Sequence, residues 1–207
     1  MTTLLIATRN VHKTAEIRQI LPGNFCIRTL DDFADAPHVV EDADTFAGNA
    51  KKKAESLARW FPADPASAHF YFLADDSGLE VDALGGAPGV HSARFAALGT
   101  GGFCNSPDSA NNAKLLRLLD GIAPEKRTAR FRCVLALARA GGGQTVFFEG
   151  ACEGRIALAP SGSGGFGYDP LFVPEGQERS FAELGEDVKN QLSHRARALE
   201  KLRVFFP

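Results

Sequence analysis

The first 30 residues constrain the fold more than any other stretch, because strand-type and helix-type patterns alternate there. The apolar runs "TLLIAT" and "FCIRTL" have the character of short buried strands, and "NVHKTAEIRQIL" between them carries apolar residues near helical spacing. The Pro22-Gly23 pair is expected to stop that helix. A strand-helix-strand order favours an α/β sheet with crossover connections.

The remainder of the chain continues this alternation. We predict a helix over 45–60 with Thr45 as its N-cap and Pro62 and Pro65 beyond its end, followed by a strand in "HFYFLAD" that stops where "DDSG" turns. The segment "RWFPADPASAHF" is longer than is needed to join that helix to that strand. The Gly/Pro-rich "GGAPGVHSARFA" is predicted to be a shaped loop.

In the second half of the chain, turn residues again separate predicted helices and strands. A helix is expected in "SPDSANNAKLLRLLDGI", capped near Ser106 or Asp108 and closed by Gly121, then a strand in "ARFRCVLALARA" and a hairpin onto another strand. A glycine loop feeding a short strand and one or two C-terminal helices complete the pattern. No repeat or linker divides the chain. The expected fold is one α/β domain over 1–207 whose strands share one sheet, with two lobes and a cleft between them, where small ligands usually bind.

Composition excludes several classes of protein. The 207 residues carry a formal net charge of −2 and no long block of like charges, so nothing indicates a nucleic acid polymer as partner. The N-terminal apolar run is too short for a signal peptide, and no stretch approaches the roughly 20 apolar residues of a membrane span. The four cysteines lack C-x-x-C spacing and are expected to be reduced thiols. We therefore expect a cytoplasmic protein without a membrane partner.

The most informative local feature is the pair Asp75-Asp76, which follows an apolar run and precedes Ser77-Gly78. Adjacent carboxylates repel each other unless a cation is present, and Mg²⁺ is typically held by one or two carboxylates together with phosphates and waters. Neighbouring side chains of an extended chain point to opposite faces, so one aspartate should face the metal while the other braces the loop. A plain polar turn is the alternative.

Two further clusters stand beside predicted helix starts. The segment "ATRNVHK", with Thr8, Asn10 and Lys13, begins the first helix, where backbone N–H groups and the helix dipole suit phosphate. The acidic group that includes Glu41 precedes the 45–60 helix and offers oxygen ligands for a divalent cation. An ordinary capped helix start and a surface helix-dipole device are the respective alternatives.

Two more clusters lie in the second half. The loop "GSGGFGYDP" exposes Phe166 between glycines, which suits stacking on a base, unless its Phe and Tyr pack inward. The segment "VKNQLSHRA" supplies Lys189, His194 and Arg195, which otherwise form a solvated basic face. Together the four clusters provide phosphate donors, metal carboxylates and an aromatic platform, the groups that a nucleoside triphosphate requires.

The motifs "ATRNVHK", "TFAGNAKKKA", "ADDSGLEVDALGGAPGVHSARF", "GGFGYDPLF" and "KNQLSHRARAL" stand in an order and spacing that resemble the inosine/xanthosine triphosphate pyrophosphatase (Ham1-like) family, over nearly the whole chain. The resemblance implies a Mg²⁺-dependent hydrolase, usually a homodimer. Its substrates would be the non-standard purine nucleoside triphosphates ITP, dITP and XTP, cleaved to the monophosphate and pyrophosphate. The resemblance also implies an elongated, two-lobed α/β fold with a mixed β-sheet, flanking helices and a central active-site cleft.

The same resemblance implies roles for individual residues. Asp76 would be the catalytic acid that accepts the proton of the water, and Glu41 and Asp76 would hold the metal with Asp75 close by. The residues implied in substrate binding are Thr8, Arg9, Asn10, Val11, His12, Lys13, Lys53, Ser77, Phe166, Gly167, Tyr168, Asp169, Lys189, His194 and Arg195.

Two positions depart from the family pattern. Arg9 stands where the first motif often has Gly, and Gly48 stands where many members carry Glu, which leaves Glu41 as the better metal candidate. Two other functions remain open on the residues alone: a pyrophosphatase for other modified or ordinary triphosphates, and a regulator that binds a nucleotide without hydrolysing it.

Overall fold

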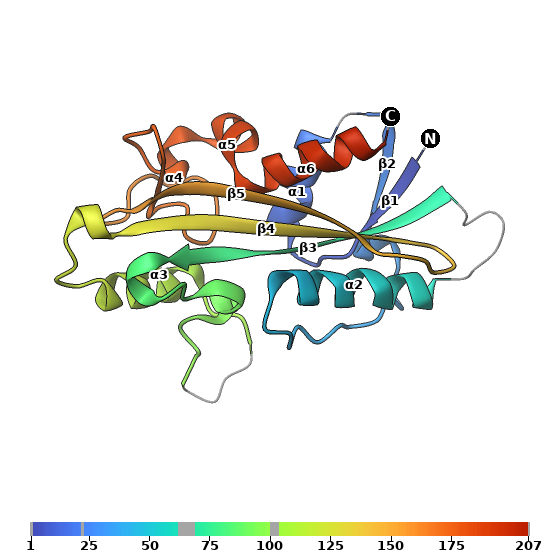
Figure 1. The fold of residues 1–207 in the computed structure, drawn as a ribbon, viewed down its shortest axis with the longest axis horizontal. Coiled ribbons are helices and arrows are strands. Elements are labelled where there is room, and N and C mark those ends of the chain that lie inside the picture. The colour runs from blue at the N-terminus through green and yellow to red at the C-terminus, as the bar shows by residue number, and fades with distance from the viewer. Residues whose placement is uncertain (1, 22, 62–68, 100–103, 207) are drawn as a thin grey trace. The chain divides into compact units, whose positions relative to one another are not determined.

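The computed structural model describes residues 2–21, 23–61, 69–99 and 104–206. Within these ranges it contains one six-stranded sheet with the strand order β2-β1-β3-β4-β5-β6, together with helices, which confirms the predicted mixed α/β class (Figure 1). Most of the segment "RWFPADPASAHF", with Pro62 and Pro65, lies outside the described residues, and so does Pro22.

The predicted opening is confirmed. Strand β1 (Thr2–Ile6) is followed by helix α1 (Val11–Ile20) and strand β2 (Phe25–Thr29), and β1 pairs in parallel with β2. Helix α2 (Phe46–Trp60) begins at the predicted N-cap, where the Thr45 hydroxyl accepts the N–H of Gly48. Its buried positions recur at helical spacing, which is why this segment is helical.

Strand β3 (Phe70–Val81) corrects the sequence prediction at the most important point. The strand was expected to end at Asp75, but it runs on through Asp76, Ser77 and Gly78, so "DDSG" is not a turn. It pairs in parallel with β1, with Leu5 opposite Phe72. Burial explains the continuation, because eight of the twelve β3 positions are buried and a turn there would expose them.

The following elements are close to their predicted places. Strand β4 (Thr128–Arg139) neighbours β5 (Val146–Ile156), and β5 pairs antiparallel with the short strand β6 (Phe172–Pro174). The predicted shaped loop contains a short 3₁₀ segment, Gly89–Arg94, and a cis bond between Ala87 and Pro88.

Two helical predictions are wrong in detail. Helix α3 (Asp108–Leu118) has Pro107 at its N-cap, so neither Ser106 nor Asp108 caps it with a side chain. The C-terminal region forms three helices, α4 (Phe181–Leu184), α5 (Glu186–Leu192) and α6 (His194–Phe205), instead of one or two. Gly185, at a φ of 82°, separates α4 from α5, and extended Ser193 separates α5 from α6.

The chain divides into two compact units, each with its own core. Unit 1 comprises 1–76, 133–150 and 197–207, and in its core α1 and α6 pack on β1, β3 and β4 through apolar residues that include Leu4, Leu73, Leu135 and Leu199. In this unit α2 lies on the opposite side of the strands from α1 and α6 (Figure 1).

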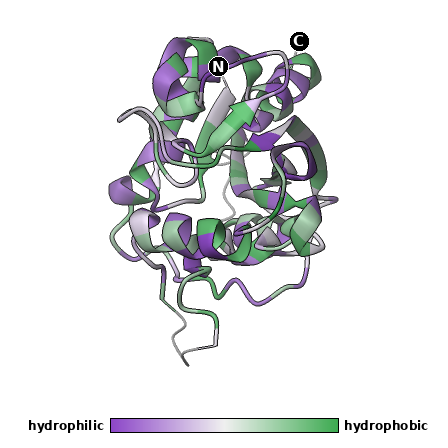
Figure 2. Cartoon of the chain, turned by 90° about the vertical axis from the view of Figure 1, so that its left-hand side faces the viewer, coloured by the Kyte–Doolittle hydropathy of each residue, from purple (hydrophilic) through white to green (hydrophobic). Residues whose placement is uncertain are grey.

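Unit 2 comprises 77–132 and 151–196, with a separate core that includes Leu115, Phe131, Phe172 and Phe181. Hydrophobic and hydrophilic residues interleave along the helices of the chain, as expected for helices that bury one side (Figure 2). All four cysteines are free thiols, as predicted. In the described ranges no helix has both the length and the apolar content needed to cross a bilayer.

Arg127 ties the end of α3 to the start of β4. Its side chain is 5% exposed and donates to the carbonyls of Ile122 at 3.0 Å, Ala157 at 3.1 Å and Leu119 at 2.8 Å. Leu119 and Ile122 belong to the turn that follows α3, and Ala157 follows β5, so the guanidinium fixes these two parts of unit 2 against each other. A planar group with five donors suits this task better than a single ammonium.

We predict that Arg127→Ala lowers the free energy of unfolding by about 2–4 kcal/mol, because three carbonyls each lose a hydrogen bond from a buried guanidinium. Arg127→Lys should recover little of that loss. The exposed Arg117, in the last turn of α3, gives a matched control: Arg117→Ala should change stability by less than about 0.5 kcal/mol. Urea unfolding of the three variants measures these free energies. Equal losses of stability in Arg127→Ala and Arg117→Ala would show that the carbonyl contacts contribute nothing.

Candidate functional site

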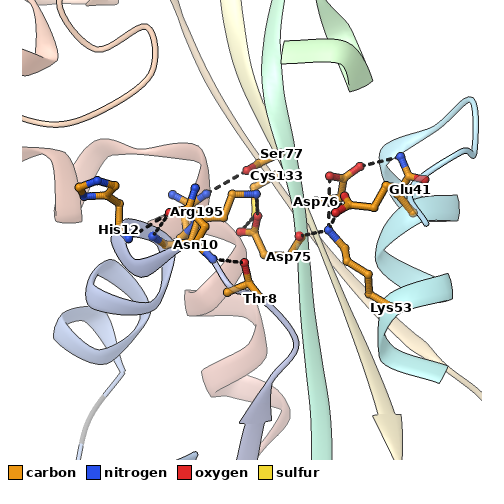
Figure 3. A network of polar contacts seen from close by, with 12 residues as sticks. Thr8, Asn10, His12, Glu41, Lys53, Asp75, Asp76, Ser77, Cys133 and Arg195 are labelled. Atoms are coloured by element: carbon orange, nitrogen blue, oxygen red, sulfur yellow. Dashed lines mark hydrogen bonds and ion pairs between the residues drawn. The ribbon is translucent and has the colours of Figure 1, made fainter. Parts of the chain in front are cut away.

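Strand β3 places its two aspartates on opposite faces of the sheet. Successive side chains of a strand alternate between faces, and in unit 1 Asp75 is directed toward α1 while Asp76 is directed toward α2 (Figure 3). Both are nearly buried, at 1% and 7% exposure. The predicted split of the pair is therefore confirmed, although it arises inside a strand and not at a turn.

Asp75 is held by a lysine and a thiol. Lys13 Nζ donates to Oδ1 at 2.6 Å, and Cys133 Sγ on β4 donates to Oδ2 at 3.2 Å. The carboxylate of Asp75 is fully enclosed in this arrangement. Asp75 therefore fixes the position of the Lys13 ammonium at the start of α1.

The start of α1 is a tightly capped turn. The Asn10 side-chain oxygen accepts the N–H groups of His12 at 3.0 Å and Lys13 at 3.1 Å, and Thr8 Oγ1 accepts the N–H of Asn10 at 3.1 Å (Figure 3). The ordinary capped start that the sequence left open is thus present. A phosphate that used these amides would have to displace the Asn10 oxygen from them.

The side chains of Arg9 and Val11, in the same segment, take no part in these capping hydrogen bonds. Arg9 donates through Nη2 to the carbonyl of Ala36 at 3.1 Å, and Val11 is 67% exposed. Arg9 therefore braces the loop after β2. Val11 offers its backbone, together with an apolar side chain, at the surface.

The opposite face of β3 carries a group around Asp76. Asn49 Nδ2 donates to Asp76 Oδ2 at 3.1 Å, and Lys53 Nζ lies 3.6 Å from Asp76 Oδ1 and 2.8 Å from Glu41 Oε2. Lys53 Nζ also donates to the backbone carbonyl of Asp75 at 2.7 Å. Asn49 and Lys53 lie one turn apart on α2, so this helix positions both donors.

Burial and charge move the two carboxyls of this group in opposite directions. Burial raises the pKa of the Asp76 carboxyl to about 6, although the positive charges of Lys53 and Lys13 act to lower it. Burial also acts to raise the pKa of Glu41, but the charge and hydrogen bond of Lys53 outweigh it and hold that pKa below its ordinary value. The pair thus combines a firmly ionised carboxylate with one that can take up a proton near neutral pH.

The donor set around Asp76 suits a hard divalent cation. One ammonium, that of Lys53, already lies between the carboxylates of Glu41 and Asp76, so this place attracts positive charge. The part of the chain that is described contains no group of three or more His, Cys, Asp and Glu side chains placed to bind a metal. A cation placed between Glu41 and Asp76 would have two protein carboxylates, which agrees with the one or two that usually hold Mg²⁺.

Position 48 shows how closely the first turn of α2 is packed. A Cβ atom at Gly48 would lie 2.8 Å from the Cβ of Ala43 and 3.0 Å from Thr45 Oγ1. A side chain there would require the preceding loop to move. The second carboxylate near Asp76 accordingly comes from Glu41 in this loop and not from α2.

Unit 2 holds the remaining predicted residues. Arg195 is 1% exposed and donates through Nη2 to Ser77 Oγ at 2.9 Å, which joins the start of α6 to β3 (Figure 3). The His194 ring stacks on Phe131 with centroids 4.8 Å apart and is 4% exposed. A solvated basic face is excluded for these two side chains, since both are buried.

The glycine loop is built around Asp169. Its Oδ2 accepts the N–H of Phe166 at 2.8 Å and forms an ion pair with the Lys189 ammonium. The same Lys189 Nζ lies 4.2 Å from the centre of the Phe166 ring. A Cβ at Gly165 would fall 2.2 Å from Asp169 Oδ2, and φ is +72° there, so this position requires glycine. The loop is thus rigidly closed, with Phe166 half-buried at its turn.

Tyr168 belongs to the core of unit 2. It is 3% exposed, packs in the apolar cluster, and its hydroxyl donates to the carbonyl of Ser92 at 2.9 Å. Burial raises its pKa, with a further contribution from the charge of Asp108. The inward packing that the sequence left open is therefore found for Tyr168.

Sequence reasoning missed several residues that the structure places beside the predicted ones. Asn49 and Cys133 contact Asp76 and Asp75, and Asp108 and Asn112 both contact Gly167. Only Asn49 had a local signal, since it stands four residues before Lys53 on the buried face of a helix. The other three are distant in sequence from the residues that they contact.

Comparison with known proteins identifies the family. The chain belongs to the Ham1 family, whose sequence pattern matches residues 4–205. It is 47% identical over 205 residues to a protein of Shouchella clausii named dITP/XTP pyrophosphatase, with 98% of this chain and 96% of that protein covered. A protein of Syntrophobacter fumaroxidans with the same name is 50% identical over 204 residues, with 98% and 81% covered.

Solved structures support the same assignment. The Ham1 protein of Staphylococcus aureus superposes with a TM-score of 0.82 at 34% identity, over 99% of this chain and 97% of that one. A nucleoside-triphosphatase / dITP/XTP pyrophosphatase of Mycobacterium abscessus gives a TM-score of 0.73 at 39% identity, over 97% and 98%. These matches confirm both the predicted family resemblance and the fold.

The raised pKa of Asp76 gives a prediction for stability. Its neutral form stabilises the fold fully below the unfolded value of 3.8, and this contribution is lost as the pH rises through about 6. Without divalent metal, Asp76→Asn should therefore gain up to about 3 kcal/mol over the wild-type chain at pH 8 and nothing at pH 4. Urea unfolding in EDTA at both values measures the difference.

A surface carboxylate provides the control. Asp42 pairs with Lys52, and the hydrogen bond from Lys52 lowers the pKa of Asp42, so its shift has the opposite sign. Asp42→Asn should give no gain at pH 8. If Asp76→Asn showed no gain either, burial of the Asp76 charge would not carry the cost assigned to it.

Proposed function

We propose that this chain is a Mg²⁺-dependent pyrophosphatase that cleaves the non-standard purine nucleoside triphosphates ITP, dITP and XTP to the monophosphate and pyrophosphate. Membership of the Ham1 family and the names of its relatives support the proposal. The observation that carries it is Asp76, a buried carboxylate with a pKa raised to about 6 that shares Lys53 with Glu41. This combination suits a general base beside a cation site.

Glu41 and Asp76 would hold the metal. When bound, Mg²⁺ would neutralise charge on the phosphate oxygens. Asp75 was expected near the metal, but its oxygens accept from Lys13 and Cys133 on the other face of β3. We therefore assign Asp75 to the positioning of Lys13.

The reaction needs water directed at the α-phosphorus. Asp76 would accept a proton as the water oxygen bonds to phosphorus, and the bond from that phosphorus to the bridging oxygen breaks with its electron pair leaving on pyrophosphate. The Lys13 and Lys53 ammonium groups would bind the phosphate oxygens on which negative charge increases. The segment from Thr8 to Lys13 would bind the rest of the triphosphate tail.

Base recognition is assigned to residues of unit 2. Phe166 offers a ring for stacking, and the donors Lys189, His194 and Arg195 suit a base with a carbonyl acceptor at position 6. Hypoxanthine and xanthine have that carbonyl, whereas adenine has an amino donor. An unmatched buried polar group costs about 1–3 kcal/mol, which corresponds to roughly 10- to 100-fold discrimination against adenine.

A homodimer and a cytoplasmic location complete the proposal. Both come from the family resemblance and the sequence class. The mass of the purified chain in solution, measured by light scattering, tests the dimer.

A substrate panel with Mg²⁺ tests the activity. We expect pyrophosphate release from ITP and XTP to exceed release from ATP by at least about 10-fold in kcat/KM, because adenine lacks the carbonyl at position 6. GTP and dTTP complete the panel and separate this activity from a pyrophosphatase for other triphosphates. Asp76→Asn should lose most turnover, about 100-fold or more in kcat, while still binding ITP. The exposed Asp42→Asn should retain full turnover, since Asp42 lies outside the Asp76 group.

Two results would contradict the proposal. Undiminished turnover of Asp76→Asn would remove this residue as the base. Tight binding of ITP by the wild-type chain with no pyrophosphate release would favour a nucleotide-binding regulator instead.

A further inference from the structure

Helix α3 holds the glycine loop at a single residue. The N–H of Gly167 donates to Asp108 Oδ2 at 2.6 Å, and the carbonyl of Gly167 accepts from Asn112 Nδ2 at 3.0 Å. Asp108 and Asn112 are four residues apart on α3, so both side chains stand on the same side of the helix. Gly167, next to Phe166, thus has its donor and its acceptor fixed by one rigid element.

We propose that Asp108 and Asn112 are positioning residues for base binding. They fix Gly167 and thereby hold the Phe166 ring where a purine can stack on it. This inference rests on the proposed function, in which the Phe166 ring stacks on the base of the substrate. Neither residue is placed in contact with the substrate.

Phe166 itself is held by contacts with Asp169 and Lys189 that do not involve α3. Asp169 Oδ2 accepts the N–H of Phe166 at 2.8 Å, and Lys189 Nζ lies 4.2 Å from the ring centre. Gly167 adopts a φ of +63°, which lets the chain reverse immediately after Phe166. The contacts to α3 are therefore the second anchor of a ring that Asp169 holds from its own loop. A ring held in place before the ligand arrives binds a base with a smaller loss of conformational freedom.

The chemistry of Asn112 indicates a positioning task and not a stabilising one. Its side chain is 8% exposed, and within the described ranges its buried Oδ1 has no hydrogen-bond partner. An unfilled buried acceptor is unfavourable, so an apolar residue of similar size would serve the core better. The contact to Gly167 is the remaining reason for an amide at this position.

The neighbouring Asn111 shows the contrast. It is 2% exposed, its Oδ1 accepts the N–H of Ala96 at 2.7 Å, and its Nδ2 donates to the carbonyls of Ala93 and Ser106. All of these partners lie in the segment that leads into α3, and none lies in the glycine loop. Asn111 therefore stabilises the fold locally, which makes it the matched structural control.

The test compares Asn112→Leu and Asp108→Ala with three controls. Asp108→Asn keeps a side-chain oxygen that can accept from Gly167, the exposed Ser109→Ala leaves the loop contacts unchanged, and Asn111→Ala removes only structural bonds. The measurements are KM and kcat for ITP, inhibition by IMP, which has a base, and inhibition by pyrophosphate, which has none. Hydrogen exchange over residues 162–169 reports the Gly167 amide directly.

We expect Asn112→Leu and Asp108→Ala to raise KM for ITP and the inhibition constant of IMP by about 10-fold, as partial loss of base stacking predicts. Their kcat and their inhibition by pyrophosphate should stay within about twofold of wild type. Exchange over 162–169 should become about 10-fold faster, although Asn112→Leu unfolds at the same urea concentration as wild type. Asp108→Asn should restore most of the binding, and Asn111→Ala should lower stability without a selective effect on IMP.

Three results would overturn the inference: unchanged exchange over 162–169, equal weakening of IMP and pyrophosphate, or an IMP-selective loss in Asn111→Ala that matches the loss in Asn112→Leu. Failure of the wild-type chain to hydrolyse ITP would contradict the proposed function but not the anchoring of Gly167 by α3. In that case the exchange of the loop amides still decides whether α3 anchors Gly167.

Discussion

The alternation of strand β3 at Asp75 and Asp76 is the constraint on which the rest of the site depends. Two adjacent carboxylates buried on the same face would repel each other, and burial of an unpaired charge is costly. The strand separates them onto two faces, and each face supplies its own lysine, Lys13 from α1 and Lys53 from α2. The crossover order that opens the chain is what allows helices to approach both faces.

The two faces impose different chemistry on identical side chains. Asp75, enclosed by Lys13 and Cys133, is a fixed acceptor that orients an ammonium. Asp76, with Asn49 and a lysine shared with Glu41, has a raised pKa and can exchange a proton. In unit 2 the groups are organised differently: buried charges such as Lys189 are paired internally, and the glycine loop is closed by hydrogen bonds around Asp169 and Gly167.

Much of the fold could be predicted from the sequence because its elements are locally consistent. The opening pattern and the Thr45 cap predicted β1, α1, β2 and α2 within a few residues. The prediction failed at "DDSG", where turn-forming residues lie inside a strand. Ser77 there accepts from Arg195, 118 residues away, and no local pattern carries that information.

The same reason limits prediction of the site. The motifs identified the residues that bear charge or stand beside glycine, and they identified the family. They did not identify Cys133 or Asn112, because each matters only through a partner that the fold brings near, Asp75 in one case and Gly167 in the other. The assignment of Asp75 to a lysine also required the structure, since the sequence shows two adjacent aspartates but not which side chain each one meets.

A crystal structure with Mn²⁺ and a non-hydrolysable ITP analogue, recorded at the manganese absorption edge, tests the central claim most directly. The account predicts an anomalous peak within coordination distance of carboxylate oxygens of Glu41 and Asp76, with Asp75 still bonded to Lys13 and Cys133. A metal ion coordinated by Asp75, or a metal ion distant from Asp76, would contradict the division of the two aspartates between the faces of β3.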